Sequence, residues 1–84
     1  MPRPDHRFRF ARYFEEKVLR KRPYVKHEWC IRVVTNPIRH DREPGGRYRF
    51  WAPIEELDGR ILRVITLEDR VTILNAFPDR RFKR

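Results

Sequence analysis

The fold of this chain is decided by residues 47–77, which read RYRFWAPIEELDGRILRVITLEDRVTILNAF. The stretch holds three runs rich in aromatic and branched apolar residues, and we expect strands at Arg47–Ile54, Arg60–Leu67 and Val71–Phe77. The pair Asp58-Gly59 is a hairpin signal between the first two runs. The pattern predicts an antiparallel sheet with one apolar face toward a core and one face that carries arginines and aromatic side chains.

The length of the first loop decides which side chains share a face, because a shift of one residue exchanges the two faces. A two-residue turn at Asp58-Gly59 places Arg63 on the apolar face. A three-residue loop at 57–59, with a left-handed glycine in a bulge, pairs Glu56 with Arg60 instead. We favour the second register because it separates charge from core. It gives Phe50, Ala52, Ile54, Leu62 and Val64 on the core face, and Arg49, Trp51, Arg63 and Ile65 on the other.

A similar three-residue loop at 68–70 joins the last two expected strands. It places Arg70 where such a loop prefers glycine. With this loop, Leu74 and Ala76 join the core face, and Ile73, Asn75 and Phe77 join the arginine face.

The N-terminal half predicts helices. Phe10, Phe14 and Val18 recur at helical spacing in a helix expected over Phe8–Arg20, and a second helix is expected over Lys26–Thr35. A charged edge strand at Ile38–Glu43 follows. The order is ααββββ, an α+β fold with two N-terminal helices packed on one face of a four-stranded antiparallel sheet.

Composition limits the class of protein. The 84 residues make one domain, 1–84, with a loose N-terminus at 1–7 and a basic tail at 78–84. Lys and Arg number 21 against 12 Asp and Glu, a net charge of +9 that favours an anionic partner such as RNA, DNA or an acidic protein. A lone cysteine, Cys30, cannot form an internal disulfide. With neither a secretory signal nor the roughly 20 apolar residues of a membrane helix, we expect a cytoplasmic protein without membrane contact.

Three side chains of the arginine face are candidates for binding one phosphate. Arg49, Arg63 and Asn75 converge on adjacent strands that lie about 4.7–4.9 Å apart. Trp51 beside them would stack a base. The competing interpretation is that the arginine stems cover apolar sheet while their guanidinium groups are solvated.

Further basic residues surround this face. Arg47, Arg80 and Lys83 are candidates for substrate binding. The tail that contains Arg80 and Lys83 either folds back over the arginine face or frays as a basic terminus.

Several kinds of chemistry are disfavoured. His27 and Cys30 share a helix face, but they make only half a zinc site, so no metal and no cofactor are expected. The chain has no serine and no glycine-rich phosphate loop, which excludes serine hydrolases and nucleotide-binding folds.

Five segments carry a resemblance to short uncharacterised bacterial proteins that are similar to BrnT and RelE-type toxins of type II toxin–antitoxin systems. The resemblance implies a barnase/RelE-like ribonuclease fold with substrate on the sheet face away from the helices. The segments are F-x-x-K-V at Phe14–Val18, Asn36-Pro37, GRYRFW at Gly46–Trp51, GRILRVI at Gly59–Ile65 and NAFPDRRFK at Asn75–Lys83.

The leading hypothesis is therefore a toxin that acts as a metal-independent endoribonuclease, with an antitoxin encoded next door. A ribose 2′-hydroxyl would attack the adjacent phosphate, Arg49 and Arg63 would stabilise the developing charge, and Asn75 would orient the phosphate. His40 or Tyr48 would transfer the proton. The alternative is a non-catalytic nucleic-acid-binding or protein-interaction module with the same basic face.

Overall fold

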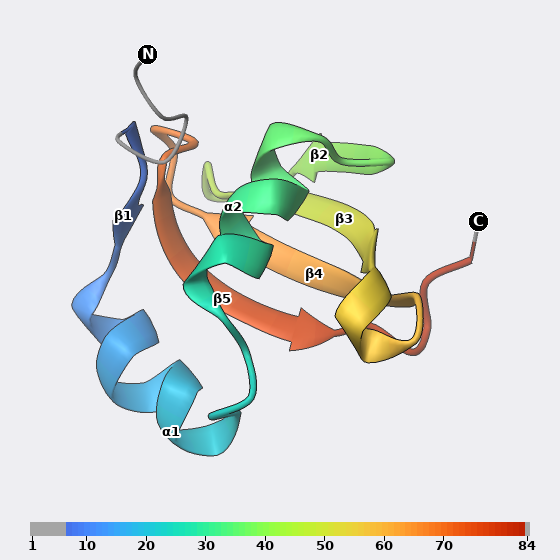
Figure 1. Ribbon diagram of the computed structural model, residues 1–84. Helices are drawn as coiled ribbons and strands as arrows, with labels where there is room; N and C mark the ends of the chain where they lie inside the picture. The colour runs from blue at the N-terminus through green and yellow to red at the C-terminus, as the bar shows by residue number, and fades with distance from the viewer. Residues whose placement is uncertain (1–6, 84) are drawn as a thin grey trace, which may run out of the picture.

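The computed structural model describes residues 7–83, in which a five-stranded sheet carries helical segments on one face (Figure 1). The expected loose N-terminus at 1–7 lies, apart from Arg7, outside the described residues. The strands are β1 (Arg9–Phe10), β2 (Arg39–Arg42), β3 (Tyr48–Ile54), β4 (Arg60–Thr66) and β5 (Thr72–Pro78), in the spatial order β1-β5-β4-β3-β2. The helical segments are η2 (Phe14–Val18, a π-helix), α1 (Leu19–Lys21) and α2 (His27–Thr35).

The N-terminal segment begins as a strand where a helix was expected from Phe8. The N–H groups of Arg9 and Ala11 donate to the carbonyls of Val71 and Ile73, both at 2.9 Å, so β1 runs parallel to β5. An edge strand leaves backbone groups unpaired, and this pairing satisfies some of them on β5. The expected ααββββ arrangement, with a four-stranded antiparallel sheet in the barnase/RelE-like order, is therefore wrong: the sheet has five strands and one parallel pair.

The β3–β4 hairpin has a longer loop than expected. Ile54 lies opposite Arg60, and the loop contains the 3-10 turn η3 (Glu55–Leu57) followed by Asp58 and Gly59, both left-handed with φ of 56° and 77°. The expected pairing of Glu56 with Arg60 is thus wrong by two residues. Because side chains alternate with a period of two, the shift leaves every side chain on its expected face.

The β4–β5 pairing contains a bulge that the sequence did not reveal. Asn75 lies opposite Ile65, but Ile73 lies opposite Thr66, so Leu74 is the extra residue. Ile73 is therefore fully buried in the core and Leu74 is only half-buried, the reverse of the expected assignment.

The core lies between the sheet and the helical segments. Its helical side comes from η2, α2 and the connection between α1 and α2, and burial raises the pKa of the Cys30 thiol to about 12. Each of its members is at most 6% exposed. The members are Phe14, Val18, Val25, Trp29, Cys30, Val33, Phe50, Ala52, Ile54, Leu62, Val64, Ile73 and Ala76.

Candidate nucleic-acid interface

The sheet face opposite the helices carries most of the residues expected at the site. The register aligns these side chains in two rows across the strands from β2 to β5. One row consists of Arg39, Trp51, Arg63 and Phe77, and the next consists of Asp41, Arg49, Ile65 and Asn75.

Arg49 is already bound within the second row. Its Nε and Nη2 donate to the two carboxylate oxygens of Asp41 at 2.6 and 2.9 Å, and Glu43 lies 4.0 Å from Nη1. The hydrogen bonds to Asp41 are the main cause of a raised pKa at Arg49. Asn75 Oδ1 likewise accepts the backbone N–H of Ala76 at 2.8 Å. The structure thus places Arg49, Arg63 and Asn75 on one face, but with the guanidinium of Arg49 neutralised by protein carboxylates.

The C-terminal tail, residues 79–83, covers Trp51. The indole is 5% exposed, and its Nε1 donates to Asp79 Oδ2 at 2.9 Å. The ring of Phe82 lies over Trp51 with centroids 5.7 Å apart, and the guanidinium of Arg39 lies 4.5 Å from the Phe82 centroid. Arg39 Nη2 also donates to the carbonyl of Lys83 at 3.2 Å. The tail therefore folds back over the arginine face, and the tilted ring of Phe82 occupies the place where a base was expected to stack.

Asp79 anchors this tail. Its carboxylate accepts the Trp51 indole and the backbone N–H of Arg81 (3.0 Å), and it faces Arg63 Nε at 3.9 Å. Burial disfavours the charged form of Asp79, but these hydrogen bonds and the Arg63 charge outweigh it and lower the pKa. Arg63 Nε itself is buried and finds no hydrogen bond within residues 7–83.

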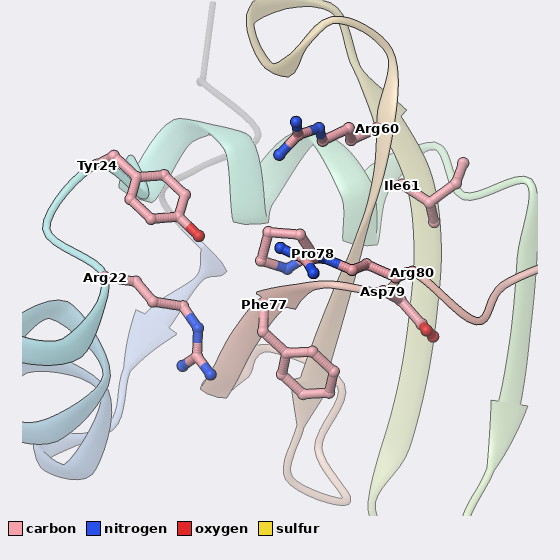
Figure 2. A pocket seen from close by; sticks show the side chains of 8 residues that line it. All are labelled: Arg22, Tyr24, Arg60, Ile61, Phe77, Pro78, Asp79 and Arg80. Atoms are coloured by element: carbon pink, nitrogen blue, oxygen red, sulfur yellow. The ribbon is translucent and has the colours of Figure 1, made fainter.

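A basic hollow of about 590 Å³ lies beside the end of β5 (Figure 2). Arg22 and Tyr24 come from the connection between α1 and α2, Arg60 from the start of β4, and Arg80 from the tail. Figure 2 shows the Tyr24 hydroxyl and the Arg60 guanidinium directed into the hollow from opposite sides. Phe77 contributes an aromatic wall, with the Arg22 guanidinium 5.6 Å from its centroid.

A second hollow, of about 480 Å³, lies over Trp51, and Asp79 lines both hollows. We call the cations of the two hollows the basic strip. Within residues 7–83, Arg63 is the one member within 4.0 Å of a carboxylate. The members are Arg22, Arg60, Arg80, Arg63, Arg39, Arg81 and Lys83.

His40 and Tyr48 lie on the other face of the sheet, apart from the two rows. His40 pairs with Phe50 across β2 and β3, and its ring stacks on Phe50 at 6.1 Å. Tyr48 precedes Phe50 by two residues and shares its face. The expected proton-transfer groups are therefore separated by the sheet from Arg49 and Arg63. Arg47 is exposed in the turn before β3.

Sequence reasoning missed Arg22, Tyr24, Arg60 and Asp79. The first two lie far along the chain from β5, and only tertiary packing brings them to it. A signal existed for Asp79, the one carboxylate in the basic tail, because a lone acid among arginines often organises them.

Two further properties concern the described part of the chain, residues 7–83. No group of three or more His, Cys, Asp or Glu side chains there is placed to hold a metal ion. No helix there is long and apolar enough to cross a membrane.

Comparison with known proteins found no match among protein-family models, curated proteins or solved structures. The resemblance to BrnT and RelE-type toxins therefore stays a prediction, and function has to be argued from the geometry.

Proposed function

We propose that this chain binds single-stranded RNA along the basic strip. The observation that carries the proposal is the charge of the strip: it gathers seven cations around two hollows and a single carboxylate, Asp79. Cations at this density repel one another, and a phosphate backbone relieves that repulsion and releases its own counterions.

Aromatic side chains interleave with these cations. Tyr24 and Phe77 line the first hollow and Phe82 lines the second. Because every base has a π-face, stacking on such rings contributes about 1–3 kcal/mol per base with little sequence preference. A duplex keeps its bases stacked on one another, so this surface favours a single strand.

Cleavage of the bound RNA, as a toxin would perform it, needs a group that takes the proton from the 2′-hydroxyl. The basic strip contains no histidine, and His40 lies across the sheet from it. Binding is therefore better supported by the geometry than cleavage at Arg49, Arg63 and Asn75. Growth arrest on induced expression, relieved by a neighbouring antitoxin gene, would establish the toxin function. Normal growth would favour the binding module.

The binding experiment compares two double variants that each remove two positive charges. Arg60→Ala/Arg80→Ala removes strip cations, and Arg12→Ala/Arg20→Ala removes cations outside it. Affinity for a fluorescent single-stranded RNA is measured by anisotropy as a function of salt.

For about four to six contacted phosphates, the wild-type logarithmic salt slope should be about −3 to −4. The strip variant should lose at least tenfold in affinity and about one unit of slope. The control variant should change much less. Equal losses in the two variants would show that net charge, rather than the strip, holds the RNA. A DNA strand of the same sequence tests whether the sugar is recognised.

A further inference from the structure

A third hollow, separate from the two of the basic strip, lies on the helix side of the sheet, between the end of α2, the N-terminal segment and β3. It measures about 370 Å³, within the range of small-ligand sites. Its floor is apolar, and no carboxylate is among the described residues that line it. The polar lining is Arg7, Thr35, His40, Tyr48 and Arg70, and the apolar lining is Phe8, Val34, Pro37, Phe50 and Val71.

Arg70 lines this hollow although its backbone conformation is unfavourable for a residue with a side chain. Its φ is +64°, in the left-handed region, where a non-glycine residue costs about 1–2 kcal/mol. Asp69 holds the turn by accepting the N–H groups of Val71 and Thr72 at 2.9 and 2.8 Å. From there Arg70 Nη2 donates to the Tyr48 hydroxyl at 3.1 Å, and its guanidinium lies 4.3 Å from the ring centroid. Folding alone favours glycine at this position, so a strained arginine aimed into a hollow points to a ligand.

His40 and Tyr48 frame the same space. Both rings approach Phe50, at centroid distances of 6.1 and 6.4 Å. Because His40 pairs with Phe50, Tyr48 is its diagonal neighbour on the same face of the sheet. Both side chains therefore line the hollow from two adjacent strands, β2 and β3.

We propose that this hollow binds a terminal phosphate monoester. Arg7 and Arg70 supply two guanidinium groups, His40 a ring nitrogen and Tyr48 a hydroxyl, while the apolar floor takes the adjoining sugar or base. A monoester carries about −1.5 to −2 charges at neutral pH, against one for a backbone diester, so it matches two cations whose hollow is lined by no carboxylate from residues 7–83. The 5′-phosphate of an RNA end and a free nucleoside 5′-monophosphate share this chemistry. Binding of an RNA end at this hollow rests on the RNA binding proposed above, whereas binding of a free nucleotide does not.

The test uses one RNA sequence prepared with a 5′-phosphate or a 5′-hydroxyl, and measures the ratio of the two affinities by anisotropy. The wild type should prefer the phosphorylated end by about tenfold, as for a ligand with added charge-assisted hydrogen bonds. Arg70→Gly should abolish the preference, although glycine suits the turn. Arg12→Ala, which removes the same charge elsewhere, should keep it.

Adenosine 5′-monophosphate, titrated as a competitor, separates the two sources. Competition that removes the preference supports a site that accepts a free nucleotide. A preference that survives the competitor supports a site for an RNA end. Equal affinities for the two ends, without nucleotide binding detectable by NMR, would overturn the proposal. Arg60→Ala/Arg80→Ala should weaken both RNAs and leave their ratio intact, so failure of this site is distinguishable from failure of the basic strip.

Discussion

The two faces of the sheet are stabilised by different means. On the helix side, Leu62, Val64 and Ile54 are fully buried among apolar neighbours, and burial of area supplies the stability. On the opposite face, Trp51 is buried beneath a charged tail that is held by one carboxylate, Asp79. The helix side is therefore stabilised by many weak contacts, whereas the tail side depends on a few polar ones.

The largest effect should come from the helix side. Leu62→Ala removes a fully buried side chain and leaves a cavity, so we expect the free energy of unfolding to fall by about 2–4 kcal/mol. Ile65→Ala, on the opposite face, where the side chain is half-buried, should cost about half as much or less. Urea titration measures both. Equal losses would show that the two faces contribute equally to the free energy of unfolding, contrary to this prediction.

A second prediction concerns the anchor of the tail. Asp79→Asn keeps the size of the side chain but removes the charge that faces Arg63. We expect the free energy of unfolding to fall by about 1–2 kcal/mol, because a hydrogen bond to a charged group contributes about 1.5–3 kcal/mol and a neutral one about 0.5–1.5 kcal/mol. The emission of Trp51 should shift to longer wavelength as the tail loosens. An unchanged spectrum with unchanged stability would mean that the Asp79 charge is dispensable and that the contacts of Phe82 with Trp51 and of Lys83 with Arg39 hold the tail.

The pKa of Asp79 makes the tail contacts sensitive to acid. The Asp79 carboxyl has a lower pKa in the folded protein than in the unfolded chain, where its pKa is about 3.8. Around that pH the folded state therefore binds fewer protons than the unfolded state. The contribution of Asp79 to the free energy of unfolding is present above about pH 4 and is lost as the pH falls through the pKa of the folded state. Tryptophan emission should therefore change below pH 4 in the wild type. In Asp79→Asn that change should be absent, and an identical acid transition in both proteins would assign it to other carboxylates.

The faces of the sheet could be predicted from sequence, and the exact registers could not. Alternation places Arg49, Trp51 and Arg63 opposite the core whatever even-numbered shift the loop imposes. The bulge at Leu74 escaped prediction because it exchanges two residues of similar hydrophobicity, Ile73 and Leu74, which carry no pattern to tell them apart. The strand at Arg9–Phe10 was not predicted because the spacing of its apolar residues also fits a helix. Pairing with the edge of β5 favours the strand over the helix, and this pairing depends on tertiary structure.

The residues of the candidate site that lie on strands could be predicted from the sequence. Those that are brought together by tertiary contacts could not. Arg63 and Trp51 follow from alternation, but the hollow at Arg22 and Arg60 forms between segments distant in sequence. The same alternation that buries Phe50 also puts Tyr48 on the helix side, so the separation of Tyr48 from Arg49 could have been predicted.

The smallest effect should separate folding from function on the helix side. The β3–β4 and β4–β5 loops each hold a left-handed residue at a similar φ: Gly59 at 77° and Arg70 at 64°. Gly59→Ala should cost about 1 kcal/mol, because nothing crowds its Cβ position and only the backbone conformation opposes alanine. Arg70→Gly relieves that strain, but it removes the contact with Tyr48 and increases the conformational entropy of the unfolded chain. Because these effects oppose one another, the free energy of unfolding should stay within about 1 kcal/mol of the wild type. If Arg70→Gly instead costs more than the core variant Leu62→Ala, the arginine is a structural part of the turn, and its strain carries no evidence for a phosphate site.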